Sequence, residues 1–271
     1  MKTKAFYAKW SISFLLLNIY VNLIPRFIPP DKVHMWAVYW LGFFILASLL
    51  ARYLLGLKGI CDFGLQLHRR WLVNLGLGFG IGIATYALKY GLFYSLGKFE
   101  INGLMSASYI LNLLLLGALA MLFSSLLNDI MIRGYTLAFC RNGSTMRWYV
   151  PAATALYVLD DFWNGDASLV NILFSALLGL AFAWTVYKTG SIWMSFGLHW
   201  GGNLVYRLMY GFDGQGIWKL GNTVESPTFN YLSLAVTAAM FGLAYWALRK
   251  WNLKAGDGTE QAAYSGETVN Q

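Results

Sequence analysis

Side chains that could do chemistry occur at three places in an otherwise apolar sequence. In chain order they are Asn128, Asp129 and Arg133, then Asp160 and Asp161, then His199 and Asn203. Carboxylates and histidine are common general acids and bases, and amide or guanidinium groups can stabilise developing negative charge. If the three places meet in space, they could form a site for proton transfer or hydrolysis.

Spacing indicates which of these side chains share a face. Asp129 and Arg133 are four residues apart, so on a helix they lie on one face and can pair. His199 and Asn203 have the same spacing on a later segment. Taken singly, each has a structural alternative: an ion pair that only fixes helix packing, and a hydrogen-bonded interior histidine.

The composition decides what kind of protein must position these groups. Hydrophobic residues make up 58% of the 271 residues and charged residues 12%, about half the ~25% share of a typical soluble domain. Mean hydropathy is +0.52. An ordinary soluble domain is excluded, and a membrane protein is predicted. The net charge of +8 is assigned to loops that set orientation, and no nucleic-acid partner is expected.

Apolar segments separated by polar ones predict an all-α polytopic membrane bundle of about eight transmembrane helices, each needing ~20 mostly apolar residues. Their approximate ranges are 7–25, 35–56, 71–95, 106–140, 147–164, 168–187, 190–211 and 228–248. Residues 1–252 are expected to form the bundle. Residues 253–271, which are polar and small, are expected to form a disordered cytoplasmic tail.

Most of the 20 Lys and Arg residues fall on one side of this topology, with Arg133 counted there as a loop charge. The other side holds Arg26, Lys32, Lys89, Lys98, Arg207 and Lys219. Because basic loops favour the cytoplasm, we predict a multi-pass protein with both termini cytoplasmic.

Three ionisable residues have similar predicted depths in this bundle. At 1.5 Å per residue from the cytoplasmic end of each helix, Asp129, Asp161 and His199 lie ~18, ~21 and ~15 Å deep. Ionisable groups at such depths are costly and usually face the bundle interior or a wet cavity. The shared depth predicts one buried polar site that opens to the cytoplasm.

Alternating glycines in the third predicted helix indicate close helix packing. Gly76, Gly78, Gly80 and Gly82 form two small-xxx-small pairs, which let a neighbouring helix approach. Ile81 stands where a dinucleotide-binding motif would need glycine, so phosphate binding is not expected.

The three polar places resemble the motifs of the CAAX-protease and bacteriocin-processing (CPBP, or abortive-infection) intramembrane proteases, over about residues 105–205. The family's first motif, Glu-Glu-x-x-x-Arg followed by Gly, is similar to residues 128–134. Its second, Phe-x-x-x-His, falls on residues 157–161. Its third, His-x-x-x-Asn, is intact at residues 199–203.

This resemblance implies an intramembrane peptidase in which a glutamate and the second-motif histidine activate water. The third-motif histidine and asparagine would support the oxyanion, and His199 and Asn203 match them. The residues that would activate water differ from those of the family. Asn128 and Asp129 replace the two glutamates of the first motif. Asp161, or Asp160 if the register shifts by one, replaces the histidine of the second motif.

These departures leave several functions open. Asp129 and Asp161 could form a rebuilt acid/base pair, because two close carboxylates in a low dielectric separate their pKa values. With His199 they could instead hold Zn or Mn. A catalytically inactive scaffold is the main alternative, and a small transporter that uses Asp160, Asp161 and His199 as a proton relay is a third. Expected partners are membrane lipids and a hydrophobic or lipidated peptide or membrane protein.

Overall fold

The helices of the computed structural model match the predicted ones. It describes residues 4–29, 32–141, 143–163, 165, 167–251 and 253. The α-helices are α1 Lys4–Leu23, α2 Val33–Leu49, α3 Trp71–Ser95, α4 Ala107–Asp129, α5 Tyr135–Cys140, α6 Tyr149–Asp161, α7 Leu169–Thr189, α8 Trp193–Tyr210 and α9 Pro227–Lys250. Short 3-10 helices are η1 Ile24–Phe27, η3 Ile60–Phe63 and η5 Gly143–Trp148. The all-α class is confirmed.

Two π-helical segments interrupt the long helices. η2 Leu50–Leu54 extends α2, and η4 Ile130–Gly134 joins α4 to α5 in one continuous rod. A π turn repeats at i,i+5, and such turns are frequent at functional sites. η4 lies directly after Asp129, so it sets the position of the first polar motif.

In the part of the chain that the structure describes, six helical segments are long and apolar enough to cross a membrane. They contain α1, α2, α3, α4 with α5, α7 and α9. α6 has 13 residues, or ~20 Å, which is short of the ~30 Å hydrocarbon core. α8 has 18 residues but carries His199, Asn203 and Arg207. The chain is an integral membrane protein. The sequence predicts eight spans, whereas the described residues contain six candidate spans, and α6 and α8 are two further helices.

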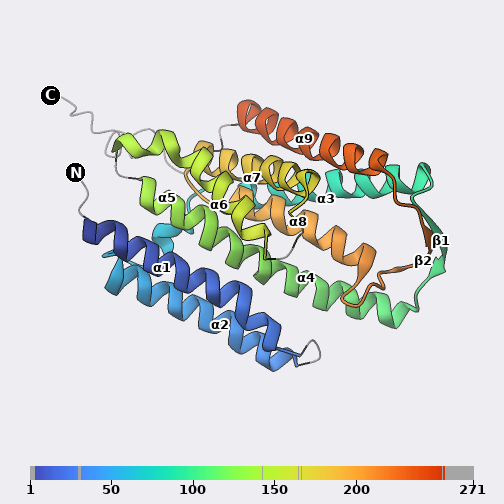
Figure 1. The fold of residues 1–271 in the computed structure, drawn as a ribbon, viewed down its shortest axis with the longest axis horizontal. Coiled ribbons are helices and arrows are strands. Elements are labelled where there is room, and N and C mark those ends of the chain that lie inside the picture. Colours follow the sequence, from blue (N-terminus) through green and yellow to red (C-terminus); the bar gives the residue numbers. More distant parts are fainter. Residues whose placement is uncertain are drawn as a thin grey trace.

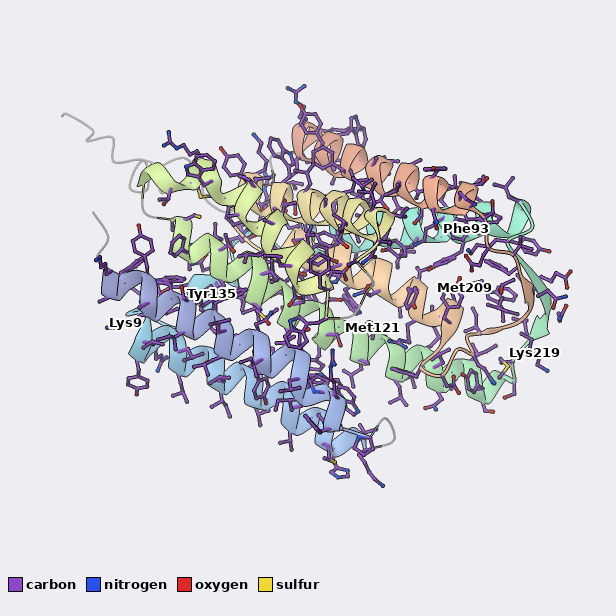
Figure 2. The ribbon with its side chains drawn as sticks, in the orientation of Figure 1. Lys9, Phe93, Met121, Tyr135, Met209 and Lys219 are labelled. Carbon is purple, nitrogen blue, oxygen red and sulfur yellow. The ribbon has the colours of Figure 1, made fainter. Side chains whose placement is uncertain are left out.

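The helices form a layered bundle around α4. In Figure 1, α1 and α2 lie on one side of α4, and α9 lies on the far side beyond α3, α7 and α8. α3 packs most extensively against α8, and α6 packs against α7. Lys9 and Lys219 mark opposite ends of the bundle in Figure 2. The start of α1 and the end of α9 lie toward the same end, whereas the cytoplasmic location of the termini stays a prediction.

A small antiparallel sheet closes the end of the bundle opposite the start of α1 (Figure 1). Strands β1 Phe99–Leu104 and β2 Trp218–Thr223 pair with Ile101 opposite Leu220. They lie in the connections from α3 to α4 and from α8 to α9, and they were not predicted from the sequence. Each strand is six residues long, too short to stand out between two apolar helices.

Serine residues begin three of the helices. Ser106, Ser168 and Ser226 precede α4, α7 and α9 in extended conformations, and each side-chain oxygen accepts a backbone N–H of the first turn. Such caps satisfy donors that have no partner inside the helix. They fix where these three helices begin.

Glycines on both α3 and α8 allow these helices to touch along their backbones. A Cβ at Gly78 or Gly82 would overlap a backbone carbonyl of α8. Reciprocally, a Cβ at Gly197 or Gly201 would overlap a carbonyl of α3. The predicted close packing is therefore confirmed for one pair, whereas the other two glycines of the alternating set face open space.

Apart from Leu253, the predicted tail at residues 253–271 lies outside the described residues. Whether residues 1–252 form a single domain stays a prediction.

Candidate active site

The centre of the polar site is a bond between α4 and α8. Asp129, the last residue of α4, is fully buried. One carboxylate oxygen is 2.8 Å from Nδ1 of His199, and the other accepts the hydroxyl of Ser195. An ionised carboxylate favours the imidazole tautomer that carries its proton on Nδ1. Nε2, on the other side of the ring, makes no hydrogen bond with the described residues and is left able to accept a proton.

A second bond one turn away keeps the same two helices in register. Asn203 donates from Nδ2 to the Ser125 hydroxyl at 3.1 Å. Ser125 and Asp129 are four residues apart on α4, as are His199 and Asn203 on α8, so the two bonds form rungs between antiparallel helices. Asn203 therefore shares the α4-facing side of α8 with His199, as its spacing predicts.

Arg133 is fully buried in η4, so counting it as a loop charge in the orientation argument was wrong. Its Nη1 donates to the side-chain oxygen of Asn128 at 2.6 Å, whereas it is 3.7 Å from Asp129. The cause is the π turn, because i,i+5 positions come together there instead of the i,i+4 positions of an α-helix. The predicted pair is present as a close ion contact, and Asn128 is the hydrogen-bond partner.

Aromatic rings cover the rest of the Arg133 guanidinium. Its carbon is 4.3 Å from the ring centroid of Tyr157 and 4.7 Å from that of Phe182. Such cation–π contacts stabilise a desolvated cation. Nε and Nη2 have no hydrogen-bond acceptor among the described residues. The same two rings contact His199, with centroids 6.3 and 5.0 Å from the imidazole, so imidazole and guanidinium border one aromatic-walled region.

Asp160, rather than Asp161, joins this network. Its two oxygens accept amide hydrogen bonds from Asn18 at 2.7 Å, Asn22 at 2.8 Å and Asn128 at 2.8 Å. Asp160 is 5% exposed, and these donors replace the water that a buried carboxylate loses. Through Asn128, it is connected to the Arg133 guanidinium.

Asp161 points to a different helix. Its carboxylate accepts from Nδ2 of Asn171 at 3.2 Å and from the hydroxyl of Ser175, both on α7. Among the described residues, no group of three or more His, Cys, Asp and Glu side chains could hold a metal ion. The predicted Zn or Mn ligand set of Asp129, Asp161 and His199 therefore does not fit this arrangement, because Asp161 is bound to α7. The predicted acid/base pairing of Asp129 with Asp161 stays untested.

α1 also contributes to the site, and the sequence pattern did not predict this. Asn18 and Asn22 are four residues apart in an otherwise apolar helix, and this spacing on one face is a signal that could have found them. Ser195 and Ser125 gave no comparable signal, because small hydroxyl residues are common in membrane helices, where they bond to neighbours.

Fold and site together define a polytopic membrane protein. Between its helices lie the buried Asp129–His199 pair, Arg133, and Asp160, whose carboxylate accepts three amide hydrogen bonds. Residues 110–205 match the family model of the Rce1-like proteins, described as type II CAAX prenyl endopeptidase Rce1-like. This match confirms the resemblance to the CPBP family and contains every predicted site residue from Asn128 to Asn203. No curated protein and no solved structure matches the chain significantly.

Proposed function

We propose that the protein is an intramembrane endopeptidase for hydrophobic or lipidated peptides, with a rebuilt site in which His199 activates water. The observation that carries the proposal is the 2.8 Å contact between Asp129 and Nδ1 of His199. This arrangement orients the imidazole, leaves Nε2 as the base and stabilises the imidazolium that forms. The Rce1-like match supports the reaction class.

The reaction would run as a general acid–base hydrolysis. Nε2 of His199 takes a proton from water, and the resulting hydroxide attacks the carbonyl carbon of the scissile peptide bond. The carbonyl electrons move to oxygen, giving a tetrahedral oxyanion. When this intermediate collapses, the C–N bond breaks and the imidazolium returns its proton to the leaving amine.

Arg133 is our candidate for stabilising the oxyanion. Its Nε and Nη2 have no acceptor among the described residues, and its guanidinium is fixed by Asn128 and two aromatic rings. Preorganised donors in a water-poor site stabilise developing charge strongly. The family resemblance assigns this role to His199 and Asn203. In our proposal Arg133 stabilises the oxyanion instead, and His199 activates the water. Asn203 then acts by positioning α8.

The decisive experiment uses the full-length protein in liposomes and a fluorogenic peptide panel with and without a prenyl group. Asp129→Asn and His199→Gln should each lower kcat by ~10²–10⁴-fold, the usual contribution of general acid–base catalysis. His34→Gln is the matched control, because His34 is exposed at the start of α2. Melting temperatures would verify folding. Cleavage that persists in His199→Gln would refute this mechanism.

An inactive scaffold remains the second candidate. It is favoured by the loss of the second-motif histidine and by the hydrogen bonds that occupy Asp160 and Asp161 within the bundle. In that case the fold would bind a membrane partner without cleaving it. We also propose that the site opens to the cytoplasm, the side on which the distribution of Lys and Arg predicts both termini.

A further inference from the structure

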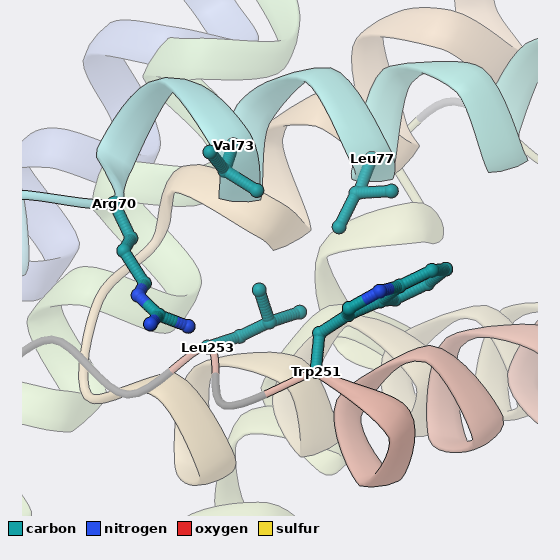
Figure 3. A pocket seen from close by; sticks show the side chains of 5 residues that line it. All are labelled: Arg70, Val73, Leu77, Trp251 and Leu253. Atoms are coloured by element: carbon teal, nitrogen blue, oxygen red, sulfur yellow. The ribbon is translucent and has the colours of Figure 1, made fainter.

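A cavity of about 280 Å³ lies between the beginning of α3 and the chain that follows α9. Its lining residues are Arg70, Val73, Leu77, Trp251 and Leu253, none of which belongs to the candidate active site. Figure 3 shows Val73 and Leu77 projecting from α3 toward Trp251 and Leu253, with the Arg70 guanidinium at one end. Among the described residues that line it, four are apolar and Arg70 is the one cation.

The cavity wall after α9 is held in place by hydrogen bonds. Asn74, fully buried on α3, donates from Nδ2 to the backbone carbonyl of Leu253 at 3.1 Å. The backbone N–H of Trp251 donates to Ala247 at 3.0 Å, which ends α9. Trp251 and Leu253 therefore form the second side of the cavity.

The cavity lies at the ends of two candidate spans. α3 begins at Trp71, and α9 ends with Arg249 and Lys250 in its last turn. The rings of Trp71 and Trp193 pack 4.9 Å apart at this end. Tryptophan is enriched at the headgroup level, and basic residues near the surface attract anionic lipids.

We propose that this cavity binds an anionic phospholipid. The lipid phosphate would bind Arg70, whose planar guanidinium suits phosphate oxygens. The beginning of one acyl chain would fill the apolar space between Leu77 and Trp251. A free phosphate would use only the cation, and a zwitterionic lipid would bring no net negative charge to a helix end that carries Arg249 and Lys250 in its last turn.

Native mass spectrometry of the full-length protein in detergent would test this. The probes are phosphatidylglycerol and phosphatidylcholine with identical acyl chains. We expect tighter binding of phosphatidylglycerol, an affinity about tenfold lower in Arg70→Ala, and a smaller loss in Arg70→Lys. Arg69→Ala is the matched control, because its neighbouring charge does not line the cavity. Leu77→Trp keeps the cation but fills the space, so it should also weaken binding.

Three results would overturn the proposal. Equal binding of the two lipids would remove the charge requirement, and equal losses in Arg69→Ala and Arg70→Ala would indicate a diffuse basic surface. Displacement of the lipid by inorganic phosphate would indicate a simple anion site. If Arg70→Ala does not fold, Leu77→Trp and Arg70→Lys decide the question, because unchanged phosphatidylglycerol binding in Leu77→Trp would exclude the cavity as the binding site.

Discussion

The side-chain amide of Asn128 donates a 2.8 Å hydrogen bond to the carboxylate of Asp160. The oxygen of the same amide accepts from Arg133 at 2.6 Å. Position 128 is a glutamate in the family motif that the sequence resembles. In this chain a second carboxylate, from α6, is connected to the arginine through Asn128, in addition to Asp129 of α4 at 3.7 Å. The substitution that looks like a loss in the sequence is matched by a buried carboxylate elsewhere.

The hydrogen bond between Asn128 and Asp160 predicts that the amide and the carboxylate can exchange positions. Asn128→Glu should lower the melting temperature, because it brings a second carboxylate against Asp160 in a buried site. Asn128→Glu combined with Asp160→Asn should recover most of that loss, because the amide and carboxylate then only exchange places. Thermal unfolding in detergent would measure both variants. If the double variant is no more stable than Asn128→Glu alone, the two positions are not coupled.

Arg133 should be essential for stability as well as for any chemistry. Arg133→Ala leaves the buried carboxylate of Asp129 without its cation, at a cost of ~3–5 kcal/mol. Adding Asp129→Ala should recover part of the loss. Arg147→Ala provides the control, because Arg147 is exposed and should change stability little. A double-mutant cycle by thermal melting, with no coupling between Arg133 and Asp129, would contradict the prediction.

The sequence predicted most helices because they are long apolar segments between polar ones, and it singled out the motif residues because ionisable groups are rare in such segments. It could not predict that Arg133 bonds to Asn128 instead of Asp129. That difference depends on the π turn of η4, which the apolar pattern does not encode.

The adjacent residues Asp160 and Asp161 show a second limit of prediction from the sequence. Asp160 and Asp161 are equivalent by composition and depth, yet Asp160 faces α1 and Asp161 faces α7. Adjacent residues on a helix point ~100° apart, and only the arrangement of neighbouring helices decides which one reaches the arginine network.

Alanine substitutions should distinguish the glycines at the contact between α3 and α8 from a glycine of α3 that lies outside it. Gly78→Ala and Gly201→Ala should sharply lower folded yield, because each added Cβ would overlap a backbone carbonyl of the partner helix. Gly80→Ala is the matched control, because nothing lies within 4 Å of its added Cβ. It should be neutral or stabilising by up to ~1 kcal/mol, through helix propensity. Size-exclusion recovery and melting temperature would show the contrast, and equal effects at Gly78 and Gly80 would argue against it.

His68 predicts a pH dependence of stability. It lies before α3, with Nε2 3.1 Å from the Ser191 hydroxyl, and partial burial lowers its pKa from the ordinary 6.5. The folded state therefore binds fewer protons than the unfolded state just below pH 6.5, so stability falls as pH falls through that value. His68→Gln should reduce the loss in melting temperature between pH 7.5 and about 5.5. His34→Gln, at an exposed site, should not.

Asp161→Asn distinguishes two mechanisms for the candidate site, one with an Asp129–Asp161 acid/base pair and one with His199 as the base. If Asp129 and Asp161 form the acid/base pair that the sequence suggested, this nearly isosteric change should abolish cleavage while leaving abundance unchanged. If His199 is the base, as we propose, Asp161→Asn should retain most activity, because Asp161 bonds to Asn171 and Ser175 instead of the imidazole. His199→Gln should then be the inactivating change. Peptide cleavage by both variants, measured beside melting temperature, distinguishes the two mechanisms.

The scaffold alternative predicts a third pattern. Neither Asp161→Asn nor His199→Gln should then affect function in cells, and the unmodified protein should cleave no peptide of the panel. Restoring the family residues would sharpen this test, with Asn128→Glu, Asp129→Glu and Asp161→His made together. Asp160→Asn should be added, because we expect that a glutamate at position 128 is not tolerated beside Asp160. Cleavage that appears only in this fourfold variant would mean that the natural chain keeps the fold but has lost the peptidase chemistry. Cleavage by the unmodified protein that is lost in His199→Gln would instead establish a working site rebuilt around Asp129 and His199.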